Sequence, residues 1–177
     1  YDLLCLVLPW DQVDESICAK PLEWSGKTLG RFMRFFGPIS SVFDIITFAY
    51  LFFVLCPAVC GGTFTSLSGS GEQARFIILF QTGWFLESMW TQVMILHLLR
   101  TQKVPLLQSR PSRPVMVVTL LGTAVFTLLT FTPMGEWIGL TALPPVYFVF
   151  LAVTVFFYLL WVTLAKRWYI RRYHELL

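Results

Sequence analysis

The chain has 177 residues, of which 56% are hydrophobic, 17% are aromatic and only 13% are charged, with a net charge of +3. Globular domains average about 25% charged residues, and a soluble fold of this composition would expose large apolar surfaces. The composition therefore excludes a soluble globular domain and predicts an all-α membrane protein, and it gives no sign of nucleic-acid binding.

The first ten residues, YDLLCLVLPW, are apolar but would form only about 15 Å of helix, which is half the thickness of a bilayer. One interpretation is a short helix at the membrane interface. The other is the second half of a membrane-spanning helix, and Asp2 inside this apolar segment favours it. The predicted fold is half of one transmembrane helix plus four full transmembrane helices in a bundle.

Long apolar runs predict the four full spans, at about residues 37–60, 76–99, 115–132 and 144–165. A flexible Gly/Ser/Thr-rich loop is expected at residues 61–75. Cys56 and Cys60 are four residues apart around Pro57, so a disulfide between them requires a broken helix. The role of this pair is open.

Basic residues predict the orientation in the membrane. Twelve of the 13 Lys and Arg residues lie in three polar segments, with four in each, at residues 11–36, 100–114 and 166–177. The positive-inside rule puts these segments in the cytoplasm, so the C-terminus is cytoplasmic. The basic, aromatic tail suits an anionic membrane surface, which makes membrane lipids an expected partner.

The span at residues 76–99 carries a polar stripe. Its 24 residues contain no Lys or Arg, but Glu87 lies at their middle. On a helical wheel, Glu87 and several other polar side chains fall within one arc of about 140°, namely Gln81, Ser88, Thr91 and Gln92. Because a carboxylate in the membrane interior is costly, this face should point to protein or water, with the other spans packed around it.

Asp44 is the one charged residue of the span at residues 37–60. It can lie near the interface and pair with Arg31 or Arg34, or it can line an ion pathway. Its position about two turns from the basic end favours the first interpretation.

Asp2 and Glu87 are the acids expected deepest in the membrane. With Gln81, Ser88 and Gln92 as polar lining, they supply hard oxygen donors that suit magnesium, calcium or a proton. Either acid can instead be protonated and hydrogen-bonded. The chain contains no glycine-rich phosphate loop, no Asp-Lys-Thr-Gly-Thr phosphorylation motif and no catalytic Ser/His/Asp arrangement. No catalytic residue is assigned.

Several motifs resemble magnesium-transporting P-type ATPases. YDLLCLVLPWDQVD, AKP and GRFMRFFGPISSVFDIITF resemble the region from the sixth span to the start of the seventh. FQTGWFLES and HLLRTQKVPLLQSR resemble the eighth span and the cytoplasmic loop after it, and YIRR in the tail also fits. The similarity covers nearly the whole chain, residues 1–177.

The resemblance implies the C-terminal transmembrane domain of an ATP-driven pump in a bacterial inner membrane, with magnesium as the transported ion. Asp2 matches the Asp of an Asn-x-x-Tyr/Thr-Asp pattern, where it is an ion ligand, and Glu87 is the weaker carry-over from the eighth span. ATP would bind only in the missing N-terminal part of the same pump, which is the expected partner. The alternatives are the same region of a proton or calcium pump, or a non-enzymatic membrane scaffold or accessory protein.

Overall fold

The computed structural model describes residues 2–12, 26–101 and 109–173, and within these ranges the chain forms helices and no strands. Residues 13–25 of the predicted polar segment at residues 11–36 lie outside the described residues. The helical elements in chain order are α1 (Asp2–Cys5), the 3-10 turn η1 (Leu8–Trp10), α3 (Gly26–Tyr50), the π-helical turn η2 (Leu51–Leu55), α4 (Cys56–Cys60), α5 (Ser70–Leu99), α6 (Arg113–Leu129), α7 (Pro133–Trp137) and α8 (Pro145–Tyr173).

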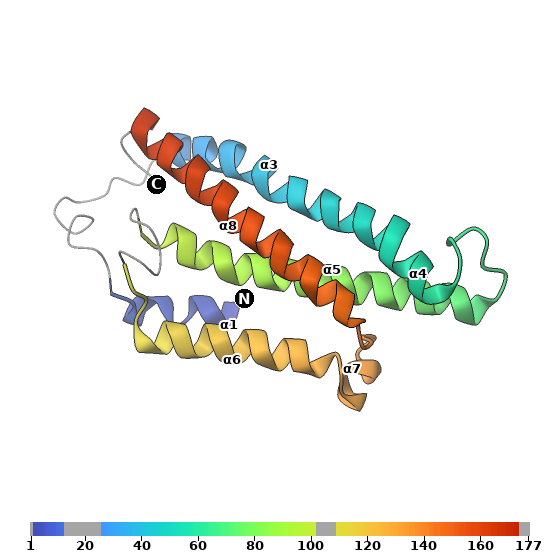
Figure 1. Cartoon of the computed structure of the whole chain (residues 1–177). Coiled ribbons are helices and arrows are strands. Elements are labelled where there is room, and N and C mark those ends of the chain that lie inside the picture. Colours follow the sequence, from blue (N-terminus) through green and yellow to red (C-terminus); the bar gives the residue numbers. More distant parts are fainter. Residues whose placement is uncertain (1, 13–25, 102–108, 174–177) are drawn as a thin grey trace.

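Helix α5 is the centre of the bundle. It packs against α3, α4, α6 and α8, and it separates α6 from α3 and α8 (Figure 1). This arrangement confirms that the other helices are organised around the segment at residues 76–99. The short elements α1 and η1 lie beside α6.

The helix containing α3 starts at Gly26, eleven residues before the predicted start of the first full span at residue 37. It runs without a break from Gly26 through η2 to Cys60, over 35 residues. Pro38 inside α3 cannot donate to the carbonyl of Arg34, but it does not end the helix. The side chain of Ser41, one turn on, donates to the carbonyl of Gly37 at 3.2 Å.

The π-helical turn η2 ends two residues before Pro57. In this wider turn the Cys56 N–H donates to the carbonyl of Leu51, five residues back. The helix thereby accommodates a proline that has no N–H to donate. Cys56 and Cys60 follow within the helical segment α4 as free thiols, so they form no disulfide.

Two further boundaries differ from the prediction. Helix α5 begins at Ser70, so the last six residues of the predicted loop at 61–75 are helical. Helix α8 continues to Tyr173 and takes in most of the predicted tail at 166–177. The cause is burial, because Lys166 and Tyr169 in that tail are at most 1% exposed and pack inside the bundle.

Two described helical segments are long and apolar enough to cross a membrane, Gly26–Cys60 and Pro145–Tyr173. Helix α6 is apolar but has 17 residues, which is about 26 Å against the roughly 30 Å of a bilayer core. Helix α5 is longer, with 30 residues, but its polar side chains lower its hydropathy. The predicted count of four and a half spans therefore goes beyond what helix length and composition establish.

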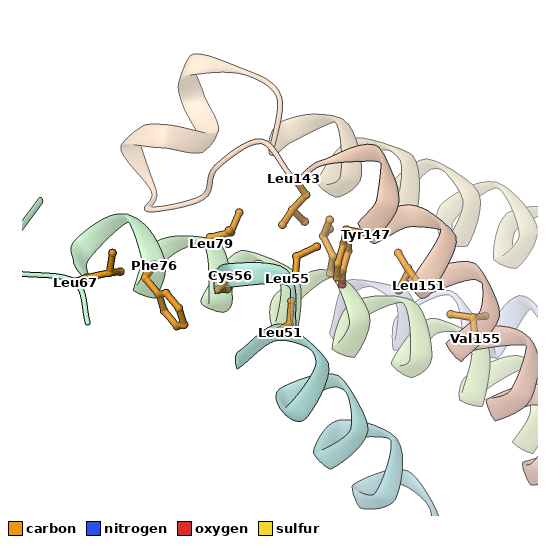
Figure 2. Packing of buried hydrophobic residues seen from close by; sticks show 11 residues of the cluster. Leu51, Leu55, Cys56, Leu67, Phe76, Leu79, Leu143, Tyr147, Leu151 and Val155 are labelled. Atoms are coloured by element: carbon orange, nitrogen blue, oxygen red, sulfur yellow. The ribbon is translucent and has the colours of Figure 1, made fainter. Parts of the chain in front are cut away.

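The main hydrophobic core lies where η2, α4, α5 and α8 meet. Figure 2 shows its buried side chains directed into one volume, with those of η2 facing α5 and the start of α8. Its members include Leu51, Leu55, Leu86 and Tyr147, each at most 4% exposed. A second buried cluster joins the first half of α3 to the end of α8 and includes Phe36, Tyr158 and Tyr169.

Candidate ion site

Packing divides the predicted polar stripe of α5 into two faces. Glu87 and Thr91 are buried, and Ser88 is half-buried. Gln81 and Gln92 are exposed on the outside of the described bundle. The part of the stripe available for a site inside this bundle is therefore the short segment around Glu87.

Glu87 meets a second acid. Its side chain is 1% exposed and interacts with the side chain of Asp44, which comes from α3 and is half-buried. Neither carboxylate oxygen of Glu87 accepts a hydrogen bond from an N–H or O–H donor of the described chain. With Glu87 buried and Asp44 half-buried, a shared proton or a bound cation between the two carboxyl groups would relieve their repulsion.

Hydroxyl groups surround this acid pair. The Thr47 hydroxyl lies one turn from Asp44 on the same face of α3, and it is buried without a hydrogen-bond partner. From α8, the Tyr147 hydroxyl donates to the carbonyl of Gly83, and Tyr158 lies near both acids. Carboxylate and hydroxyl oxygens are the donors that magnesium accepts.

The acid pair alone does not complete a metal site. The described residues contain no group of three or more His, Cys, Asp or Glu side chains able to hold a metal ion. A cation between Asp44 and Glu87 would therefore keep water molecules or gain ligands from elsewhere, as Mg²⁺ commonly does.

Asp2 lies apart from this pair in the described contacts. It is in the first turn of α1, which packs on α6, and its side chain is exposed. Glu87 instead faces Asp44 and the tyrosines of α8. The structure thus pairs Glu87 with Asp44 and does not bring Asp2 to the same place.

The favoured interpretation of Asp44, a pair with Arg31 or Arg34, is wrong. Asp44 lies ten residues after Arg34 in an unbroken helix, which is about 15 Å along the axis. Arg34 Nε donates to the carbonyl of Gly30, and the Arg31 guanidinium lies over the ring of Tyr173, 4.6 Å from its centroid. Both arginines remain at the basic end of α3, and Asp44 turns toward α5.

The buried ion pair at the basic end of the bundle is not among the predicted sites. Asp11 Oδ2 lies 2.6 Å from Arg100 Nη1, and Asp11 Oδ1 accepts a hydrogen bond from the Ser112 N–H at 2.7 Å. Burial alone would raise the pKa of Asp11, but the hydrogen bonds from Ser112 and Arg100, together with the Arg100 charge, lower it below its usual value. The only signal in the sequence was their opposite charge in two segments expected on the same side.

These features define a class of protein. The described residues form a helical bundle with apolar helices long enough to cross a membrane, and the acids Glu87 and Asp44 meet between two of its helices. Residues 1–168 match the family described as "Cation transporting ATPase, C-terminus", and the chain belongs to this family. The match covers all the transmembrane segments predicted from the sequence.

Relatives give the same result in more detail. The chain is 40% identical over 175 residues to "Magnesium-transporting ATPase, P-type 1" of Salmonella typhimurium strain LT2, which covers 99% of this chain and 18% of the relative. It is 37% identical over 173 residues to the protein of the same name from Escherichia coli strain K12, covering 98% of this chain and 18% of the relative. The chain thus spans less than one fifth of the length of these relatives, and the predicted resemblance is confirmed.

Proposed function

We propose that this chain forms the C-terminal transmembrane part of an ATP-driven pump that moves magnesium into the cytoplasm. The observation that carries the proposal is the 40% identity to a magnesium-transporting ATPase over 99% of the chain. ATP binding and phosphorylation would belong to the rest of the same pump, outside this chain. The pump would lie in a bacterial inner membrane.

The three basic segments support a common cytoplasmic side. Asp11, Arg100 and Ser112 are joined by hydrogen bonds, which brings the first segment to the second. Lys166 Nζ donates to the carbonyl of Thr101 at 3.0 Å, which brings the third segment to the second. A shared end requires an even number of crossings between successive segments, so α3 and α5 would form one membrane-crossing pair and α6 and α8 the other.

In this proposal the acids have different roles. Asp2 contributes a ligand to the transported ion, and the rest of the ion site is supplied by helices outside this chain. Glu87 contributes polarity or an outer-shell contact, and Asp44 belongs to the same polar lining. The remaining helices brace the transport helices.

The decisive experiment replaces Asp2 in the full-length pump. Asp2→Ala should abolish magnesium-stimulated ATPase activity and magnesium uptake, because the ion loses a carboxylate ligand. Glu136→Ala is a matched control, since this acid is exposed on the short helix α7. Normal magnesium stimulation of Asp2→Ala would remove Asp2 from the site.

The same assay separates the alternatives. Stimulation of the unmodified pump by calcium or protons, and not by magnesium, would assign the chain to another kind of cation pump. An autonomous scaffold or accessory protein would show no ATPase activity and would have an in-frame stop codon followed by a start codon immediately upstream of the codon for Tyr1.

A further inference from the structure

The carboxylate of Asp11 joins three parts of the fold. Asp11 follows η1, at the end of the segment at residues 2–11 that begins with α1. Its Oδ2 atom binds Arg100 at the C-terminal end of α5, and its Oδ1 atom binds the backbone N–H of Ser112, which is the N-cap residue of α6. One side chain therefore holds the segment at residues 2–11 to the adjacent ends of two long helices.

Arg100 is fixed as firmly as its partner. Its second amino group donates to the Ser109 carbonyl at 2.8 Å and to the Ser109 hydroxyl at 3.2 Å. The side chains of Arg100 and Asp11 are only 5% and 7% exposed. A buried ion pair with this many hydrogen bonds has a defined geometry, and removing one partner leaves the other charge buried and unpaired.

Backbone hydrogen bonds order the segment between Asp11 and Asp2. The Asp11 N–H donates to the Leu8 carbonyl, the Trp10 N–H to the Val7 carbonyl, and the Leu6 N–H to the Asp2 carbonyl, at 2.9 to 3.2 Å. The exposed Asp2 side chain has no hydrogen bond of its own among the described residues that would fix it. The fixed point at the other end of the segment is the contact of Asp11 with Arg100 and Ser112.

We propose that Arg100 and Asp11 are positioning residues that set where Asp2 stands relative to α5 and α6, and thereby set the affinity of the pump for magnesium. This inference rests on the proposed function, because it takes Asp2 as an ion ligand. It assigns to the loop after α5 a role in ion binding, although this loop lies outside the ion site itself.

The test uses the full-length pump with Arg100→Gln, with Asp11→Asn, and with both substitutions together. The magnesium concentration for half-maximal ATPase activity should rise about tenfold, the low end of what loss of an outer-shell partner costs a metal site. The ATP concentration for half-maximal activity should not change. The double variant should shift no further than either single variant, since both remove the same interaction.

Two further variants separate positioning from general damage. The double variant leaves no unpaired buried charge, so it should fold even where a single variant does not. Arg100→Lys keeps the charge but loses the two-pronged contact, and it should restore part of the affinity. Arg113→Gln is the matched control, because this exposed arginine starts α6 close to the same loop. Magnesium affinity equal to that of Arg113→Gln would overturn the proposal.

A distance measurement keeps this result distinct from the proposed function. Spin labels at the exposed positions Leu6 and Leu120, in a background without other cysteines, report how α1 sits on α6. Arg100→Gln should broaden their distance distribution, and an unchanged distribution would overturn the proposal whatever the pump does. If Asp2→Ala pumps normally, the ligand role proposed for Asp2 fails, and the distance distribution still decides whether the ion pair positions the segment.

Discussion

Gly83 lies where α5 meets both η2 and α8. A Cβ atom at this position would stand 2.6 Å from Cδ2 and 3.0 Å from Cδ1 of Leu51, both on a side chain with no exposed surface. The Gly83 carbonyl also accepts a hydrogen bond from the buried hydroxyl of Tyr147. Because glycine has no side chain, Leu51 and Tyr147 can both come close to the backbone of α5 at this position.

We therefore expect Gly83→Ala to destabilise the full-length protein by about 1–3 kcal/mol, the usual cost of overfilling a packed core. Gly122→Ala in α6 is a matched control, since its added Cβ meets nothing within 4 Å. There the better helix propensity of alanine should leave stability equal or slightly higher. Thermal unfolding of the full-length protein in detergent measures both, and equal midpoints for the two variants would refute the packing argument.

The C-terminal end of α5 is capped from another helix. Lys166 Nζ in α8 donates to the carbonyls of Leu98 at 2.8 Å and Thr101 at 3.0 Å, and the side chain is 1% exposed. The last carbonyls of a helix lack partners within it and carry partial negative charge, so an ammonium group is a suitable cap. Lys166 consequently ties the end of α5 to α8.

Lys166→Met keeps most of the apolar stem but removes the ammonium, so two buried carbonyls lose a donor. The expected loss is about 1–3 kcal/mol, the cost of leaving buried acceptors unsatisfied. Arg167→Met changes an exposed neighbour in the same turn and should have little effect. Unfolding midpoints compare the two variants, and hydrogen exchange at residues 96–101 should rise only in Lys166→Met. Unchanged exchange there would show that α5 does not depend on this cap.

The helices themselves could be predicted because long apolar runs have few alternatives in a membrane. The ends of the helices could not be predicted, because tertiary contacts determine where each helix begins and ends. The helix containing α3 begins eleven residues before the predicted span and runs through Pro38. The basic tail suggested a surface segment, but burial of Lys166 and Tyr169 extends α8. The composition of a segment predicts its average environment, whereas the ends of these helices depend on the contacts of single side chains.

At the scale of the whole molecule, the acids could be picked out but their neighbours could not. Helical periodicity placed Glu87 on a polar face that should avoid lipid, and Glu87 is buried in the bundle. Its partner Asp44 depends on the rotation of α3 against α5, which is set by contacts such as Leu51 on Gly83. The sequence patterns contain no information on that rotation. They therefore favoured Arg31 or Arg34, and not Glu87, as the partner of Asp44.

The roles proposed for Asp2 and Glu87 differ, and paired substitutions in the full-length pump separate them. Glutamine at position 87 keeps the size and polarity of Glu87, and its amide can donate to Asp44, so Glu87→Gln should keep the magnesium concentration for half-maximal ATPase activity within about threefold. Glu87→Leu removes that polar contact and leaves Asp44 facing an apolar group, so it should lower both stability and activity. Asp2→Asn should instead raise that magnesium concentration at least about tenfold without changing the unfolding midpoint, because a direct ion ligand loses its charge while an exposed side chain loses no packing. A larger loss of magnesium affinity in Glu87→Gln than in Asp2→Asn would reverse the assignment and make the contact between α3 and α5 the primary ion site.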